Sequence, residues 1–202
     1  MHAGLAPDAT AFILAGGKST RMGTDKAFLQ LGGETLLSRA LRTARAATSE
    51  VHIVGDKIRF EAFASVVEDI YRERGPLGGI HAALAATSTE LNLMFAVDLP
   101  FVDSTFLEFL LGRARGTSAL VTVPCAGHGL QPLCAVYRRE FRQHAEQALR
   151  AGKNKIDSLF AKVNTLIIDE RELRQAGFAS GIFRNLNTPG ELESARVLED
   201  RH

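Results

Sequence analysis

A run of small, hydroxylated and basic side chains follows the first apolar segment of the chain. Leu14-Ala15-Gly16-Gly17 continues into residues 18–26, which carry Lys18, Arg21 and Lys26 among serine, threonine and glycine. Glycines let backbone N–H groups approach a ligand closely, and Arg21 and Lys26 can reach phosphate oxygens. A solvated turn would explain any one of these cations, but the ordered run of residue types indicates a site for a nucleoside triphosphate.

Two well-known phosphate loops do not fit this segment. A Walker A loop needs a glycine five positions before the Gly17 of Gly-Lys-Ser, and that position is Phe12. A dinucleotide fingerprint needs G-x-G-x-x-G, which Gly16, Gly17 and Gly23 do not supply. The loop therefore predicts triphosphate binding of another kind.

Asp98 is the second candidate. It follows the apolar segment Leu91–Val97, where a carboxylate at a strand end would meet the same ligand crevice and could hold Mg²⁺ between phosphates. A turn-forming Asp before Pro100 explains the residue equally well. The neighbouring phosphate loop favours the magnesium hypothesis, because triphosphate chemistry generally recruits that metal through one or two carboxylates.

Two further groups of polar residues and glycines are weaker candidates. Asp69 ends a short apolar segment and precedes Gly75-Pro76-Leu77-Gly78-Gly79, which could open a helix N-terminus to a ligand or simply turn the chain tightly. Asn185 and Asn187 lie two apart on one side of an extended segment. A Thr188 cap with Pro189 in the first turn of a closing helix is an equally good interpretation of that segment.

These residues must be positioned by alternating strands and helices. Strands are predicted at 10–15, 50–55, 65–68, 91–97 and 163–168, and helices at 34–47, 79–87, 103–115, 139–150, 156–161 and 189–199. Segments 119–124 and 130–137 flank a turn at 126–129 and predict an antiparallel hairpin. The economical arrangement is α/β: a mostly parallel sheet with helices on both faces, in one domain of residues 1–202.

Composition excludes several other classes of protein. The chain has 202 residues, 46% of them hydrophobic, and its net charge is +1 with both signs mixed along it. That balance predicts no nucleic-acid partner, and no apolar stretch approaches the roughly 20 residues of a membrane span. Two cysteines and six scattered histidines predict neither a disulfide scaffold nor a histidine metal site. We therefore expect a soluble, cytoplasmic protein.

The sequence resembles the molybdenum cofactor guanylyltransferases, a family of small nucleotidyltransferases. Four stretches in the right order carry the likeness: LAGGKSTRMGTDKA (14–27), VVEDIYRERGPLGGI (66–80), FAVDLPF (95–101) and FRNLNTP (183–189). The resemblance implies a three-layer α/β/α, Rossmann-like nucleotidyltransferase fold. It also implies transfer of GMP from GTP to the terminal phosphate of molybdopterin, or of its molybdenum form, with Mg²⁺ as cofactor and release of pyrophosphate.

The same resemblance assigns roles to individual residues. It implies that Arg21, Lys26 and Asp98 are catalytic, with Asp98 on the metal, and that Asn185 and Asn187 lie on the pterin side. The nucleotide would be bound by Leu14, Ala15, Gly16, Gly17, Lys26, Asp69, Gly78, Gly79 and Asp98. Relatives that transfer CMP typically have Leu-Ala-Ala-Gly, so Gly16 marks the guanine type. Val54-Gly55-Asp56 and Gln131-Pro132-Leu133 depart from the asparagine and the His-Pro-Thr pattern of many relatives.

Two other functions remain open at this point. One is transfer of a nucleotide in a related reaction, either cytidylyl transfer to molybdopterin or transfer to a sugar phosphate. The other is a GTP-binding module without turnover, in which an intact magnesium site would be unnecessary. The favoured chemistry needs no strong general base, because the acceptor phosphate is already anionic. A molybdoenzyme or cofactor-delivery protein is a further conceivable partner, which no residue identifies.

Overall fold

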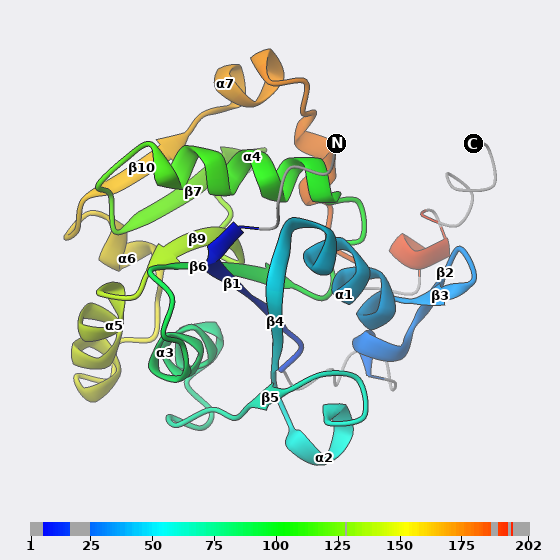
Figure 1. The fold of residues 1–202 in the computed structure, drawn as a ribbon, viewed down its shortest axis with the longest axis horizontal. Coiled ribbons are helices and arrows are strands. Elements are labelled where there is room, and N and C mark those ends of the chain that lie inside the picture. Colours follow the sequence, from blue (N-terminus) through cyan, green and yellow to red (C-terminus); the bar gives the residue numbers. More distant parts are fainter. Residues whose placement is uncertain (1–5, 17–24, 128, 187–189, 194, 196–202) are drawn as a thin grey trace.

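The computed structural model describes residues 6–16, 25–127, 129–186, 190–193 and 195. A main sheet of eight strands runs through the molecule (Figure 1). Its strands are β1 (Ala6–Leu14), β4 (Thr48–Val54), β5 (Val66–Val67), β6 (Leu91–Ala96), β7 (Val121–Ala126), β8 (Gly129–Leu130), β9 (Cys134–Arg138) and β10 (Thr165–Ile168). They are arranged in the order β10-β7-β9-β6-β1-β4-β5, with β8 paired to β7. A separate ribbon consists of β2 (Gln30–Leu31) and β3 (Glu34–Thr35).

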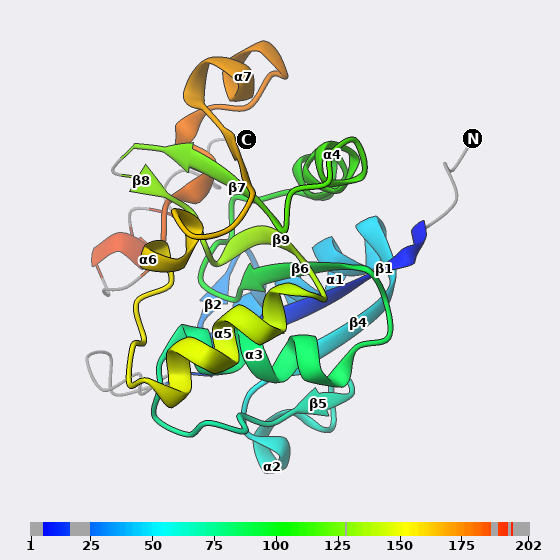
Figure 2. The same cartoon turned by 90° about the vertical axis from the view of Figure 1, so that its left-hand side faces the viewer.

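Helices cover both faces of the main sheet. The longer ones are α1 (Leu36–Ala47), α3 (Pro76–Ala86), α4 (Ser104–Arg115) and α5 (Phe141–Arg150); the short ones are α2 (Lys57–Phe60), α6 (Asp157–Phe160), α7 (Glu170–Gln175) and the 3-10 turns η1 (Lys26–Phe28) and η2 (Ser180–Phe183). Alternate residues of β1 divide the core: Ile13 packs in the cluster with α1 and α4, and Phe12 packs with α3 and α5. Figure 2 shows the strands between these two helix pairs. The predicted three-layer α/β/α fold is confirmed.

The strands at the centre of the sheet are parallel, and β9 runs against them. β1 pairs in parallel with both β4 and β6, while β9 is antiparallel to β6 on one side and to β7 on the other. The predicted hairpin is confirmed at β7 and β8, where Ala126 pairs with Gly129; His128 of its turn lies outside the described residues. The single strand expected at 130–137 is instead interrupted by a turn, in which the Cys134 N–H donates to the Gln131 carbonyl at 3.0 Å. The Gln131 side chain donates to the Ala126 and Gly129 carbonyls at 3.2 Å.

Helix α3 begins earlier than the sequence pattern predicts. We expected residues 79–87, but the helix starts at Pro76, whose ring suits a first-turn position. Gly75 has φ +63°, a left-handed conformation in which glycine is favoured, and it turns the chain into the helix. Gly78 and Gly79 therefore lie within the first turn of α3 rather than ahead of it.

Helix α7 was not predicted from the sequence. Its N-cap is Asp169, whose Oδ1 accepts a hydrogen bond from the Glu172 N–H at 2.8 Å. The short helix has one apolar residue, the buried Leu173, so it shows no hydrophobic periodicity. Of the closing helix expected at 189–199, residues 190–193 and 195 are described and helical; the others lie outside the described residues. None of the described helices has the length and apolar character needed to cross a membrane.

His81 is a buried titratable group on α3. Its ring packs edge-on against Tyr71, with 5.1 Å between ring centroids, and its buried Nδ1 has no hydrogen-bond partner within the described ranges. Burial lowers the pKa of His81. Glu146 raises this pKa by a smaller amount, and Arg142 and Arg150 lower it further. The folded protein therefore favours the neutral imidazole.

We expect the free energy of unfolding to fall as the pH drops below about 6.5, the ordinary histidine pKa. The unfolded chain takes up the proton before the folded chain does, so stability is lost by up to about 1.4 kcal/mol per pH unit until the folded pKa is passed. Urea denaturation at several pH values measures this slope. His81→Leu should flatten it, whereas the control His144→Gln should not. An unchanged slope in His81→Leu would contradict the interpretation.

Candidate nucleotide-binding site

The carboxyl ends of three parallel strands meet at one edge of the sheet. Leu14 of β1 pairs with Val54 of β4 on one side and with Ala96 of β6 on the other. Hydrogen bonding continues past the strands: the Ala15 N–H donates to the Val54 carbonyl at 3.0 Å, and the Val97 N–H donates to the Leu14 carbonyl at 3.2 Å. The residues that come directly after β1 and β6 are therefore held beside the end of β4, at the edge where ligands of parallel α/β sheets bind.

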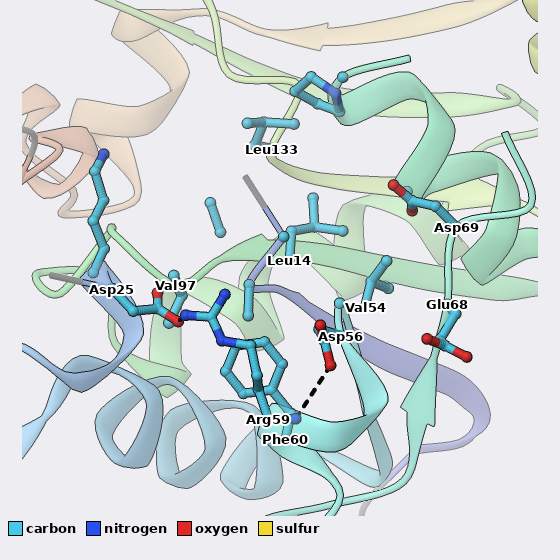
Figure 3. Close-up of a pocket in the computed structure, with 18 of the residues that line it drawn as sticks. Leu14, Asp25, Val54, Asp56, Arg59, Phe60, Glu68, Asp69, Val97 and Leu133 are labelled. Atoms are coloured by element: carbon cyan, nitrogen blue, oxygen red, sulfur yellow. Dashed lines mark hydrogen bonds and ion pairs between the residues drawn. The ribbon is translucent and has the colours of Figure 1, made fainter. Parts of the chain in front are cut away.

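A cavity of about 840 Å³ opens at this edge (Figure 3). That volume lies in the range of sites for ligands the size of a nucleotide. The predicted residues that line it are Leu14, Ala15, Gly16, Lys26, Asp69, Gly79 and Asp98. Gly17, Arg21 and Asn187 lie outside the described residues, and Gly78 and Asn185 are not on the wall.

Lys26 and Asp98 form an ion pair on the wall of this cavity. Lys26 opens η1, and its Nζ donates to Asp98 Oδ2 at 3.1 Å, with about one fifth of each side chain exposed. Among the described residues, the second oxygen of Asp98, Oδ1, accepts no hydrogen bond. The pair joins residues 72 positions apart in the sequence and leaves one carboxylate oxygen available to a ligand or metal.

Asp69 lies across the cavity from Asp25 (Figure 3). It follows β5 and faces the first turn of α3, and within the described part of the chain its carboxylate has no hydrogen-bond partner. Burial raises the pKa of Asp69. An incoming ligand with N–H or O–H donors could supply hydrogen bonds that the described residues do not.

The three glycines near the cavity differ in how much space surrounds their α-carbons. A Cβ on Gly16 would meet its nearest neighbour, the Val54 carbonyl oxygen, at an ordinary 3.8 Å. A Cβ on Gly79 would lie 3.3 Å from Val54 Cγ1 and 3.5 Å from an Asp69 oxygen, and a Cβ on Gly78 would lie 2.8 Å from the Tyr71 carbonyl oxygen. The packing of the protein thus requires glycine at 78, whereas at 16 it leaves room that a ligand could use.

The C-terminal segment passes beside the loop that carries Asp98. The Leu186 N–H donates to the Asp98 carbonyl at 3.1 Å, and Phe183 and Leu186 are buried in the core. Asn185, between them, is exposed. The structure therefore brings Asn185 close to the loop after β6, outside the cavity wall.

Sequence reasoning missed the contribution of α2. Arg59 of this helix lines the cavity and forms an ion pair with Asp25, which also lies on the wall. Asp56 caps α2, with Oδ1 accepting from the Arg59 N–H at 3.3 Å. The segment has no motif, and the available signal was its place directly after the carboxyl end of β4. The sequence left the role of Gln131 open. Its side chain donates hydrogen bonds to two carbonyls of the β7–β8 turn, and the residue does not line the cavity.

Carboxylates outnumber cations on the described wall. The acidic side chains are Asp25, Asp56, Glu68, Asp69, Glu73 and Asp98, and the basic ones are Lys26, Arg59 and Arg72. Within the described ranges, no three His, Cys, Asp or Glu side chains are grouped to hold a metal by themselves. A metal at this edge would therefore need oxygen ligands from a bound substrate in addition to Asp98.

This fold, with a nucleotide-sized cavity and a Lys–Asp pair at the strand ends, is that of a nucleotidyltransferase. A family model described as the MobA-like NTP transferase domain matches residues 11–166, and the chain belongs to that family. Enzymes of this kind generally use a divalent metal.

The similar proteins match this chain over nearly their whole length. A probable molybdenum cofactor guanylyltransferase of Pelotomaculum thermopropionicum is 36% identical, over 95% of this chain and 94% of the relative. A molybdenum cofactor guanylyltransferase of Desulfosudis oleivorans is 34% identical, over 93% and 94%. The crystal structure of molybdopterin-guanine dinucleotide biosynthesis protein A from Archaeoglobus fulgidus superimposes with a TM-score of 0.84 at 26% identity, covering 96% of this chain and 100% of that one.

We expect Gly16→Ala to leave stability within about 0.5 kcal/mol of wild type, because the added methyl group meets only ordinary contacts. The same substitution should weaken the preference for GTP over CTP, because the methyl group fills space on the nucleotide side. Gly78→Ala is the matched control: it should lose about 1–3 kcal/mol through overpacking against the Tyr71 carbonyl. Urea denaturation and calorimetric titration with each nucleotide measure the two effects. An unfolded Gly16→Ala protein, or one with unchanged nucleotide preference, would contradict this account.

Proposed function

We propose that the protein is a molybdenum cofactor guanylyltransferase, acting as one nucleotidyltransferase domain over residues 1–202. It transfers GMP from Mg²⁺-bound GTP to the terminal phosphate of molybdopterin, or of its molybdenum form, and releases pyrophosphate. The observation that carries the proposal is the Lys26–Asp98 pair at the mouth of a nucleotide-sized cavity, in a chain related over its length to guanylyltransferases. Its proposed location is the cytoplasm, in keeping with two free cysteines.

The nucleoside would occupy the half of the cavity between β1 and α3. Leu14, Ala15, Gly16 and Gly17 would lie against guanine, with Gly78 and Gly79 shaping the first turn of α3 beside it. Asp69 is half-buried and has no hydrogen-bond partner among the described residues, so it can accept hydrogen bonds from guanine N–H groups or ribose hydroxyls. A buried acceptor left without a donor costs about 1–3 kcal/mol, so such a site discriminates against bases that lack the donors.

The triphosphate would lie toward Lys26 and Asp98. Lys26 and Arg21 would donate to phosphate oxygens and neutralise the charge of the departing pyrophosphate. Oδ1 of Asp98, which has no partner among the described residues, is a suitable oxygen ligand for Mg²⁺. When bound, that ion would offset further negative charge of the phosphates, on a cavity wall where the described carboxylates outnumber the cations.

The acceptor would approach from the side of the C-terminal segment. Asn185 is exposed next to the loop after β6, and the amides of Asn185 and Asn187 can donate to and accept from a pterin ring. The acceptor phosphate is an anion and attacks without a general base, so positioning is the main task of the chain. This accounts for the absence of a nucleophile–base pair on the described cavity wall.

We expect Asp98→Asn to lower GMP transfer at least 100-fold at low millimolar Mg²⁺, because the amide retains the shape but loses the charge that the metal requires. The assay follows pyrophosphate release with GTP and molybdopterin. Asn supports the same local turn as Asp, so thermal unfolding should change little. Near-normal transfer by the folded variant would move the metal to another carboxylate, such as Asp69 or Asp25. No pyrophosphate from the wild type would reject the proposed function.

We expect Asp69→Asn to raise the stability of the nucleotide-free protein and to weaken GTP binding at least tenfold. The raised pKa means that the folded state disfavours the ionised carboxylate, so stability is lost as the pH rises from about 3.8 through the folded pKa. Replacement by a neutral amide removes that cost. Thermal unfolding at pH 7 and calorimetry with GTP and CTP measure both effects. A less stable variant with unchanged GTP affinity would contradict the assignment.

A further inference from the structure

Arg59 connects two parts of the site that are 34 positions apart in the sequence. It lies on α2, directly after the carboxyl end of β4, and its Nη2 pairs with Asp25 Oδ2 on the cavity wall (Figure 3). The Asp25 side chain is 11% exposed and the Arg59 side chain 46% exposed. The carboxylate is thus largely enclosed, and Arg59 is its cationic partner.

Asp25 also fixes the turn that carries Lys26. Its other oxygen, Oδ1, accepts a hydrogen bond from the Ala27 N–H at 3.1 Å and caps η1, of which Lys26 is the first residue. Phe28 at the end of η1 stacks on Phe60, the residue after Arg59, with 5.9 Å between ring centroids. The turn and α2 are therefore joined by one ion pair and one ring contact.

Two further hydrogen bonds connect the Arg59–Asp25 pair and the Lys26 turn to β4 and β6, the strands that flank β1. Asp56 caps α2 at the end of β4 through the Arg59 N–H, and Lys26 Nζ reaches Asp98 at the end of β6 at 3.1 Å. Polar contacts thus join Asp56 to Arg59, Arg59 to Asp25, and Lys26 to Asp98. Asp25 and Lys26 are neighbours in the chain, and the Asp25 bond to the Ala27 N–H fixes the turn between them.

We propose that Arg59 is a positioning residue for nucleotidyl transfer. It holds Asp25, and through Asp25 it holds Lys26 at the place where Lys26 meets Asp98 and the phosphates. This inference rests on the proposed function for the step that Lys26 assists. A direct contact between Arg59 and a phosphate is the competing role.

A double-mutant cycle separates these two roles. Asp25→Asn keeps an oxygen for the Ala27 N–H and removes only the charge that binds Arg59, while Arg59→Gln removes the partner. We expect each single variant to lower kcat about tenfold with a smaller change in the KM for GTP, as for a group that acts on the transition state. The double variant should be no slower than the slower single variant, because both remove one shared interaction.

Two further variants complete the series. Arg59→Lys keeps the charge and should recover part of the lost kcat, although it lacks the guanidinium geometry. Lys57→Gln removes a cation from the same helix, at an exposed position away from the cavity, and should behave as wild type. Multiplicative losses in the double variant, or a large loss in Arg59→Gln with none in Asp25→Asn, would overturn the positioning role.

An NMR measurement tests the inference without any substrate. Hydrogen exchange of the Ala27 amide, which donates to Asp25, should become at least fivefold faster in Arg59→Gln and stay unchanged in Lys57→Gln. Unchanged exchange in Arg59→Gln would overturn the inference even if the enzyme is active. If the wild type releases no pyrophosphate, the proposed function fails, and the exchange rates still decide whether Arg59 holds the Lys26 turn.

Discussion

The parallel pairing of β1 with β4 and β6 is the constraint on which the site depends. Because all three strands point the same way, their carboxyl ends share one edge of the sheet. Residues from distant parts of the sequence, such as Lys26 and Asp98, then come within hydrogen-bond distance. The helices on the two faces bury the strands and leave this edge open, and Leu133, which directly precedes the antiparallel strand β9, also lines the cavity.

Charge compensation is the second organising feature of the cavity. The wall has more carboxylates than cations, and two of those carboxylates are neutralised by Lys26 and Arg59 in the described structure. Within the described residues Asp69 has no such partner, and burial raises its pKa. Under the proposed function, the bound nucleotide would supply the hydrogen bonds that Asp69 lacks in the described part of the chain.

Three glycines that look alike in the sequence have different roles in the structure. Glycine is required at 78 because a Cβ there would lie 2.8 Å from the Tyr71 carbonyl oxygen, whereas a Cβ at 79 would make only tight contacts with Val54 and Asp69. Among the described residues Gly16 has room for a methyl group, so packing against them does not explain the glycine at that position. The sequence alone does not distinguish these three glycines. It shows that each lacks a side chain, but not which atoms lie where the side chain would be.

The sequence by itself determined the α/β alternation and the three-layer fold, because hydrophobic periodicity acts over short distances. It also placed Asp98 and Asp69 at strand ends, which share one edge of a parallel sheet, and both residues line the cavity at that edge. Only the tertiary structure decided that β9 inserts between β6 and β7, that α3 begins at Pro76, and that Arg59 pairs with Asp25. Such contacts join segments far apart in the chain and depend on packing geometry, which no local pattern of residues encodes.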